Sequence, residues 1–224
     1  MLYPLAKPHI ANKEIKRVVR VLKSGVLSLG ADTIQFENDF AKKNKTKYAV
    51  AVNSGTSGLH LAMIAAGIGS GDEVITSPFS FVASANCIMY VGAKPVFVDI
   101  DSVTYNIDPA KIEAAITAKT KAVLVVHIFG QSVDMDPVLK IAKKYKLKII
   151  EDAAQAVGAT YLNKPAGSWG HINGFSLHPL KNLHVWGDGG MATTNDPELD
   201  KNLRLQRNHG LINRDEADFF SYNS

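Results

Sequence analysis

Short apolar segments alternate with longer amphipathic segments along most of the chain. The short segments are rich in β-branched residues, which predicts strands buried within a sheet. We expect such strands at 48–52, 73–76, 95–98, 122–127, 148–151, 174–177 and 190–193.

The longer segments have apolar residues at helical spacing. They predict helices at 57–66, 81–91, 109–118 and 135–145, and two more at 11–24 and 33–44 precede the first strand. Pro109 and Pro137 each follow an aspartate, and proline suits the first turn of a helix because no donor is lost there. The alternation predicts a three-layer α/β/α domain over 1–224 with a mostly parallel central sheet and an N-terminal helical segment at 1–45.

Composition adds little to this picture but excludes several classes. Of the 224 residues, 46% are hydrophobic and 21% are charged, as in an ordinary globular protein. The net charge of +4 comes largely from lysines, clustered at 42–47 and 143–148. Without interleaved arginine and aromatic residues, these clusters predict solvated faces and no nucleic-acid partner. A single cysteine, no signal peptide and no membrane-length apolar stretch predict a cytoplasmic protein with no membrane partner.

One lysine and one aspartate stand out against this background. Lys181 lies in a stretch with few charges that is followed by glycines, and Asp152 ends the apolar run 147–152. A lysine that forms a Schiff base and a carboxylate that keeps a pyridinium nitrogen protonated are the groups that pyridoxal 5'-phosphate (PLP) needs. Read singly, Lys181 is an ordinary surface lysine and Asp152 is a helix N-cap. Gln155 is close enough in sequence to bond a phenolic oxygen in the same pocket.

A phosphate site is predicted where the strand at 48–52 gives way to a helix. The sequence there is Asn-Ser-Gly-Thr-Ser-Gly at 53–58. Free N–H groups and the positive end of the helix attract anions, and Gly55 allows a close backbone approach. Thr56 and Ser57 add hydroxyl donors, and Ser176 is a further candidate. The alternative is that these hydroxyls simply cap the helix.

Other motifs are weaker or point away from a site. Phe81 could stack on a cofactor ring, although a single phenylalanine is more often part of the core. The glycines at 67–71 follow a helix and precede a strand, which is the wrong order for a dinucleotide loop and argues against a nicotinamide-dependent enzyme. His127 and His209 lack metal-ligand spacing, so no metal is expected, and His178 is as plausibly a core residue as a catalytic one.

Taken together, these motifs resemble the DegT/StrS-type sugar aminotransferases, which are PLP enzymes of fold type I. The blocks that carry the resemblance are Ser24–Gly30, Asn53–Leu59, Pro78–Asn86, Glu151–Ala156, Ser176–Leu183 and Arg207–Gly210. The resemblance implies that Lys181 binds PLP covalently, Asp152 pairs with the ring nitrogen, Gln155 bonds the ring hydroxyl and Phe81 stacks on the ring. It also implies that Gly55, Thr56 and Ser176 hold the phosphate with support from Ser57. Family members are homodimers, and Asn223 matches a segment that contacts the partner's phosphate.

The implied activity is transfer of an amino group, from L-glutamate, to a keto group of a nucleotide-linked sugar. Such chemistry serves amino-sugar biosynthesis for surface polysaccharides or secondary metabolites. Two alternatives on the same scaffold stay open, a PLP-dependent sugar dehydratase and a cyclitol aminotransferase. Relatives that act as dehydratases replace the lysine with histidine, so Lys181 favours transamination. A non-catalytic fragment is the third alternative, because family members continue into a small C-terminal domain that is absent from this chain.

Overall fold

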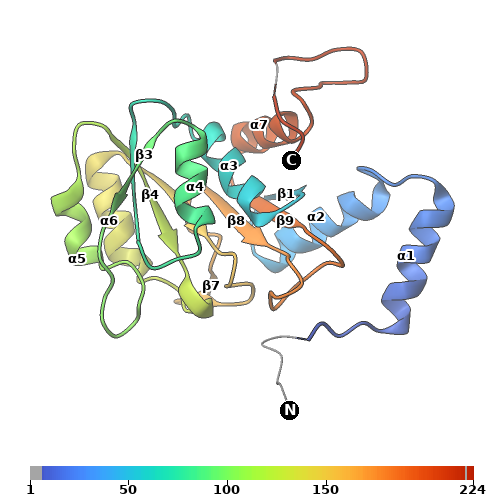
Figure 1. Ribbon diagram of the computed structural model, residues 1–224, viewed down its shortest axis with the longest axis horizontal. Helices are drawn as coiled ribbons and strands as arrows, with labels where there is room; N and C mark the ends of the chain where they lie inside the picture. Colours follow the sequence, from blue (N-terminus) through green and yellow to red (C-terminus); the bar gives the residue numbers. More distant parts are fainter. Residues whose placement is uncertain (1–6, 220) are drawn as a thin grey trace.

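A seven-stranded sheet forms the centre of the computed structural model, which describes residues 7–219 and 221–224 (Figure 1). The strand order is β1-β9-β8-β5-β4-β2-β3. The strands are β1 (Tyr48–Val52), β2 (Glu73–Thr76), β3 (Lys94–Phe97), β4 (Thr120–Val126), β5 (Lys148–Asp152), β8 (Ile172–Ser176) and β9 (Gly190–Thr194). Neighbouring strands from β3 to β8 run parallel, and only β9 is antiparallel to its two neighbours. The predicted mostly parallel sheet is therefore confirmed.

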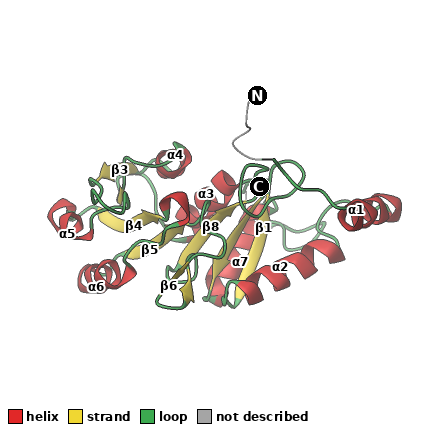
Figure 2. Ribbon diagram, turned by 90° about the horizontal axis from the view of Figure 1, so that it is seen from below, coloured by secondary structure: helices red, strands yellow, loops and turns green. Residues whose placement is uncertain are grey.

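Helices cover both faces of this sheet (Figure 2). The α-helices of the described residues are α1 (Asn12–Ser24), α2 (Ala31–Lys43), α3 (Gly55–Ala65), α4 (Ala83–Tyr90), α5 (Pro109–Ile112), α6 (Met135–Tyr145) and α7 (Pro197–Arg207). One core joins the sheet to α3, α4 and α7, and a second joins it to α5 and α6. Along β4, Leu124 belongs to the first core while Val123 and Val125 belong to the second. Both sides of the strand are buried, which explains its continuous apolar sequence.

Three elements differ from the sequence-based expectation. The segment predicted as one helix at 109–118 is the short α5 followed by a 3-10 turn at Glu113–Ala115. It stops there because Ile116 is extended and the Thr117 hydroxyl donates to Glu73 on β2 (2.6 Å). Helix α7 was not predicted, although Asp196 caps it and Pro197 occupies its first turn. The short hairpin of β6 (Thr160–Tyr161) and β7 (Lys164–Pro165) was also missed.

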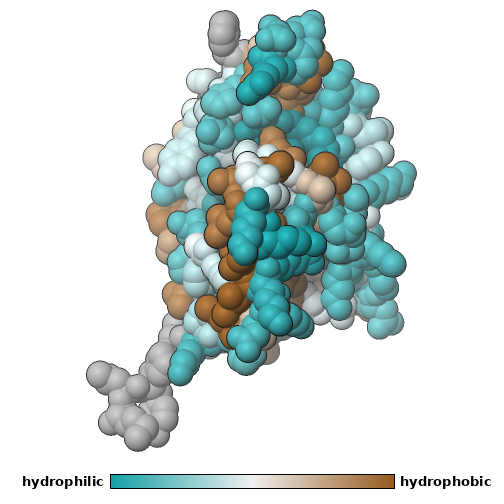
Figure 3. Space-filling view, turned by 90° about the vertical axis from the view of Figure 1, so that its right-hand side faces the viewer, coloured by the Kyte–Doolittle hydropathy of each residue, from teal (hydrophilic) through white to brown (hydrophobic). Residues whose placement is uncertain are grey.

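Helix α1 projects from the body of the domain (Figure 1). None of its residues is buried, although Ile15, Val18, Val19 and Leu22 form an apolar stripe at helical spacing. Figure 3 views the molecule from this side and shows hydrophobic surface exposed among hydrophilic side chains. Within the described residues, no helix has the length and apolar character needed to cross a membrane.

Candidate active site

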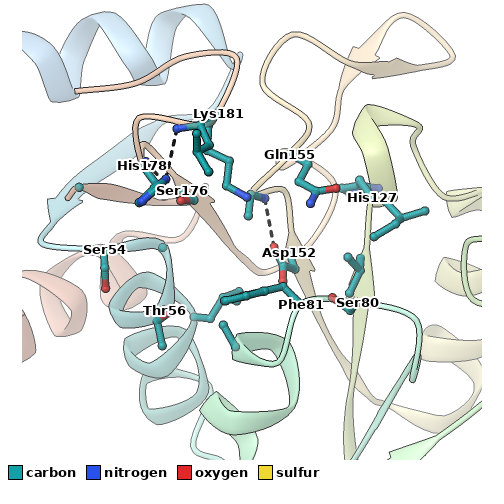
Figure 4. A pocket seen from close by; sticks show the side chains of 18 of the residues that line it. Ser54, Thr56, Ser80, Phe81, His127, Asp152, Gln155, Ser176, His178 and Lys181 are labelled. Carbon is teal, nitrogen blue, oxygen red and sulfur yellow. Dashed lines mark hydrogen bonds between the residues drawn. The ribbon is translucent and has the colours of Figure 1, made fainter. Parts of the chain in front are cut away.

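A cavity of about 570 Å³ lies where the parallel strands end at their carboxyl edge. Open α/β sheets bind ligands at this edge. Its walls come from the start of α3, the segment before α4, the ends of β4 and β5, and the loop after β8. Figure 4 shows labelled side chains from these elements gathered around one opening. Seven of the predicted site residues line it: Gly55, Thr56, Phe81, Asp152, Gln155, Ser176 and Lys181.

Two predicted site residues lie outside this cavity. The Ser57 hydroxyl donates to Asn53 Oδ1 (2.6 Å), so it supports the loop before α3. Asn223 lines a second, smaller cavity of about 210 Å³ together with Arg207 and Ser28. Its backbone pairs with that of Asn208, directly after α7. Asn223 therefore does not reach the larger cavity of its own chain.

The start of α3 has the geometry of an anion site. Ser54 is the cap, and its Oγ accepts from the N–H of Ser57 (3.1 Å). Within the described residues, the N–H groups of Gly55 and Thr56 have no acceptor. A Cβ added at Gly55 would lie 2.7 Å from the Ser176 Cβ, so only glycine lets the helix start approach the end of β8 this closely. This cradle fits a phosphate group, because free N–H groups, the helix dipole and the Thr56 and Ser176 hydroxyls converge on it.

Asp152 is the buried carboxylate of the cavity. Its Oδ2 accepts from the Ser84 hydroxyl (2.6 Å) and its Oδ1 accepts from the N–H of Ala154 (3.1 Å). Burial raises the pKa of Asp152, and these two hydrogen bonds act in the opposite direction. The positive charge of nearby Lys181 acts in the same direction as these hydrogen bonds. A carboxylate has about four acceptor positions, so Asp152 retains capacity for a donor in the cavity.

The remaining wall residues are arranged around this carboxylate. Lys181 is half-buried in the loop after β8, close enough for its charge to act on Asp152. Gln155 Oε1 accepts from the N–H of Phe129 (2.8 Å), which leaves the Gln155 amide NH₂ as a donor for the cavity. The side chain of Phe81 is 69% exposed, so the alternative reading of Phe81 as a core residue is wrong.

Sequence reasoning missed the two serines that act on Asp152. Ser80 and Ser84 lie in the motif that was quoted for Phe81, yet only the aromatic residue received a role. The signal was their spacing of four residues at the start of a predicted helix, which places two hydroxyls on one face. Among the described residues, no group of three or more histidine, cysteine or acidic side chains could hold a metal ion.

Comparison with solved structures identifies the class of protein to which this fold belongs. An aminotransferase from Psychrobacter cryohalolentis superimposes with a TM-score of 0.90 at 39% identity, covering 98% of this chain and 57% of that one. NtdA from Bacillus subtilis, solved with its bound cofactor PMP, superimposes with a TM-score of 0.88 at 37% identity, covering 96% and 50%. The chain therefore has the α/β fold of the aminotransferases.

The family follows from the sequence. A model of the DegT/DnrJ/EryC1/StrS aminotransferase family matches residues 8–224, and the chain belongs to this family. Among curated relatives, GDP-perosamine synthase of Caulobacter vibrioides is 46% identical over 208 residues, which cover 92% of this chain and 56% of the relative. The chain spans a little over half the length of the curated relatives it matches.

Proposed function

We propose that this chain is the large, cofactor-binding domain of a PLP-dependent sugar aminotransferase. The observation that carries the proposal is the convergence of a lysine, a buried carboxylate and an open helix start in one cavity. When bound, PLP supplies an electron sink for bonds at the carbon next to the amino group. Family membership and the likeness to a PMP-containing structure support this choice of cofactor.

Each wall residue has a task that its environment suits. Lys181 would hold the cofactor covalently through Nζ and carry a proton between the amino-acid carbon and the cofactor. Asp152 would hold the ring nitrogen protonated with the acceptor capacity that Ser84 and Ala154 leave free. The exposed ring of Phe81 would cover one face of the cofactor. The start of α3 with Ser176 would anchor the phosphate.

The substrates follow from the family rather than from readable contacts. We propose L-glutamate as the amino donor and the keto group of a nucleotide-linked sugar as the acceptor. The similarity to a GDP-perosamine synthase supports a nucleotide-linked acceptor. A cytoplasmic location, where nucleotide-linked sugars are made, and a role in amino-sugar biosynthesis for surface polysaccharides or secondary metabolites are part of the same proposal.

The functional unit in this proposal is a homodimer. Two features support it: the uncovered apolar stripe of α1, and the position of Asn223 away from the cavity of its own chain. In the dimer, Asn223 would serve the phosphate site of the partner. Sedimentation of the 24.2 kDa chain at micromolar concentration tests the association. A species of one-chain mass over the whole concentration range would contradict it.

The cofactor is tested by an absorption spectrum with added PLP, followed by borohydride reduction and peptide mapping. We expect a visible band and a modified peptide that contains Lys181. The Lys181→Ala variant should lose both the trapped peptide and all formation of 2-oxoglutarate from glutamate. Lys201→Ala, at an exposed position on α7, is the matched control and should behave as the unaltered protein. Trapping on a different lysine, or turnover in Lys181→Ala, would refute the assignment.

A further inference from the structure

Two serine hydroxyls and a carboxylate form a hydrogen-bonded chain behind the candidate site. Ser80 Oγ and Ser84 Oγ are 2.6 Å apart, and Ser84 Oγ is 2.6 Å from Asp152 Oδ2. Ser84 and Asp152 are buried, whereas Ser80 lines the cavity. The chain links the segment before α4 to the end of β5, across 68 positions of sequence.

The direction of these hydrogen bonds follows from the number of available protons. An ionised Asp152 accepts only, so Ser84 must donate its single hydroxyl proton to Oδ2. Ser84 Oγ is then an acceptor toward Ser80, and Ser80 donates to it. Both hydroxyl dipoles thus point toward the carboxylate, which favours its charged form.

Ser84 has no local reason to hold this position. Serine at a helix start usually occupies the N-cap position, but Ser84 is the second residue of α4. The N-cap residue of α4 is Val82, and no side chain caps that helix. The Ser84 hydroxyl is instead committed to a carboxylate on a different element, with a short, charge-assisted geometry.

From this geometry we infer that Ser84 is a positioning residue that holds Asp152 in place and in its ionised form for the cofactor ring nitrogen, with Ser80 supporting it. The part of this inference that concerns the ring nitrogen rests on the proposed function. The segment 80–84 would then contribute to two contacts of the cofactor ring. Phe81 would contact the face of the ring, and Ser84 would act on the ring nitrogen through Asp152. Three other titratable groups lie near Asp152, namely His127 on the β4 side, Lys181 in the loop after β8 and Cys87 on α4.

The first test needs no cofactor. Carbon-13 NMR of labelled aspartate carboxyl groups follows the titration of Asp152 in the protein without PLP, with Asp152→Asn assigning the signal. Loss of a donor to the charged form should raise the pKa of Asp152 in Ser84→Ala, whereas Ser84→Thr, which retains the hydroxyl, should restore it. Ser80→Ala should shift the pKa in the same direction by less. Ser168→Ala is the matched control, because Ser168 is a buried serine whose hydroxyl donates to the backbone carbonyl of Pro165 and not to Asp152.

The second test adds nitrogen-15-labelled PLP. In Ser84→Ala the ring-nitrogen signal should move toward that of neutral pyridine, and the half-reaction with glutamate should slow about tenfold, the size of one hydrogen bond to a charged group. Ser84→Thr should reverse both changes. If Ser84→Ala proves unstable, Ser84→Cys, which keeps the size with a weak donor, is measured in its place.

The two proposals fail in different ways. If PLP does not bind the unaltered protein but the pKa of Asp152 still rises in Ser84→Ala, the cofactor assignment fails and the positioning role stands. An Asp152 titration in Ser84→Ala that matches the unaltered protein overturns the positioning role, whatever PLP does. An unchanged ring-nitrogen signal in a PLP-loaded Ser84→Ala overturns the link to the ring.

Discussion

The last two residues of β5 carry the same charge and are used in opposite ways. Glu151 is fully buried, and its two oxygens accept from the backbone N–H groups of Gly167 (2.7 Å) and Trp169 (2.6 Å) and from His127 Nε2 (2.7 Å). The N–H of Gly170 donates to it as well. Asp152, one residue later and on the other face of the sheet, has two donors and opens on the cavity.

The difference shows what distinguishes a structural carboxylate from one that is available for chemistry. Burying a carboxylate costs free energy that hydrogen bonds must offset. All acceptor positions of Glu151 are filled by the loop 167–170 and by His127. His127 Nδ1 accepts from the N–H of Val133, so its Nε2 carries the proton and donates to Glu151. Asp152 keeps part of its acceptor capacity, and its raised pKa records the incomplete compensation.

Exchanging the acid for its amide at Asp152 should have the largest effect on turnover. Asparagine cannot balance a positive ring nitrogen, so glutamate turnover should fall on the order of 100- to 1000-fold in Asp152→Asn, while PLP is still trapped on Lys181. Glu151→Gln, assayed at a temperature where it remains folded, should stay within about threefold of the unaltered protein, since Glu151 points away from the cavity and only an indirect effect is expected. A comparable loss in both variants would show that the two carboxylates do not have separate roles.

The corresponding variant, Glu151→Gln, should lower the stability of the fold more than it lowers turnover. All described partners of Glu151 donate, so the amide NH₂ of glutamine would face an N–H group with no acceptor between them. We expect the free energy of unfolding to fall by about 3 kcal/mol and the melting temperature by roughly 6–12 °C. Urea and thermal unfolding measure this directly. Glu198→Gln, on the exposed first turn of α7, is the control and should change little; an equal loss there would show that the environment of Glu151 is not special.

The sequence was sufficient for the architecture and for most of the cavity. All seven strands of the main sheet lie within two residues of their predicted ends. Short apolar runs between amphipathic helices are strongly indicative of buried strands. The seven predicted residues that line the cavity were singled out by their chemistry and by the family resemblance, and they meet because strand ends converge on one edge of the sheet.

The contrast between Glu151 and Asp152 could not be read in the same way. The two acids are neighbours at the end of an apolar run, and nothing in that run indicates which carboxylate has all its acceptor positions filled by hydrogen-bond donors. The donors to Glu151 come from the backbone of a loop whose path follows no periodic pattern. The donor to Asp152 comes from Ser84, 68 residues away, and their contact depends on how α4 packs against the sheet. Such contacts follow from tertiary packing and from no local signal.

The smallest predicted effect is the contribution of Asp152 to the pH dependence of stability. The pKa of Asp152 is raised above its ordinary 3.8, so the folded protein binds this proton more tightly than the unfolded chain does. The protonated Asp152 therefore contributes to the free energy of unfolding below pH 3.8, where it is protonated in both states. This contribution is lost as the pH rises from 3.8 through the pKa of Asp152 in the folded protein. In the protein without PLP, Asp152→Asn removes this loss, because the amide does not titrate.

The free energy of unfolding, measured in urea from pH 4 to pH 8 without PLP, should therefore rise in Asp152→Asn relative to the unaltered protein as the pH increases. The difference should level off once the pH exceeds the folded pKa of Asp152. Asp215→Asn, at an exposed position, is the control and should give a difference that stays flat. A flat difference for Asp152→Asn, or one that decreases with pH, would mean that the hydrogen bonds and charges around Asp152 fully offset its burial. Asp152 would then have no free acceptor position for a ligand, and the two acids would differ only in where they lie.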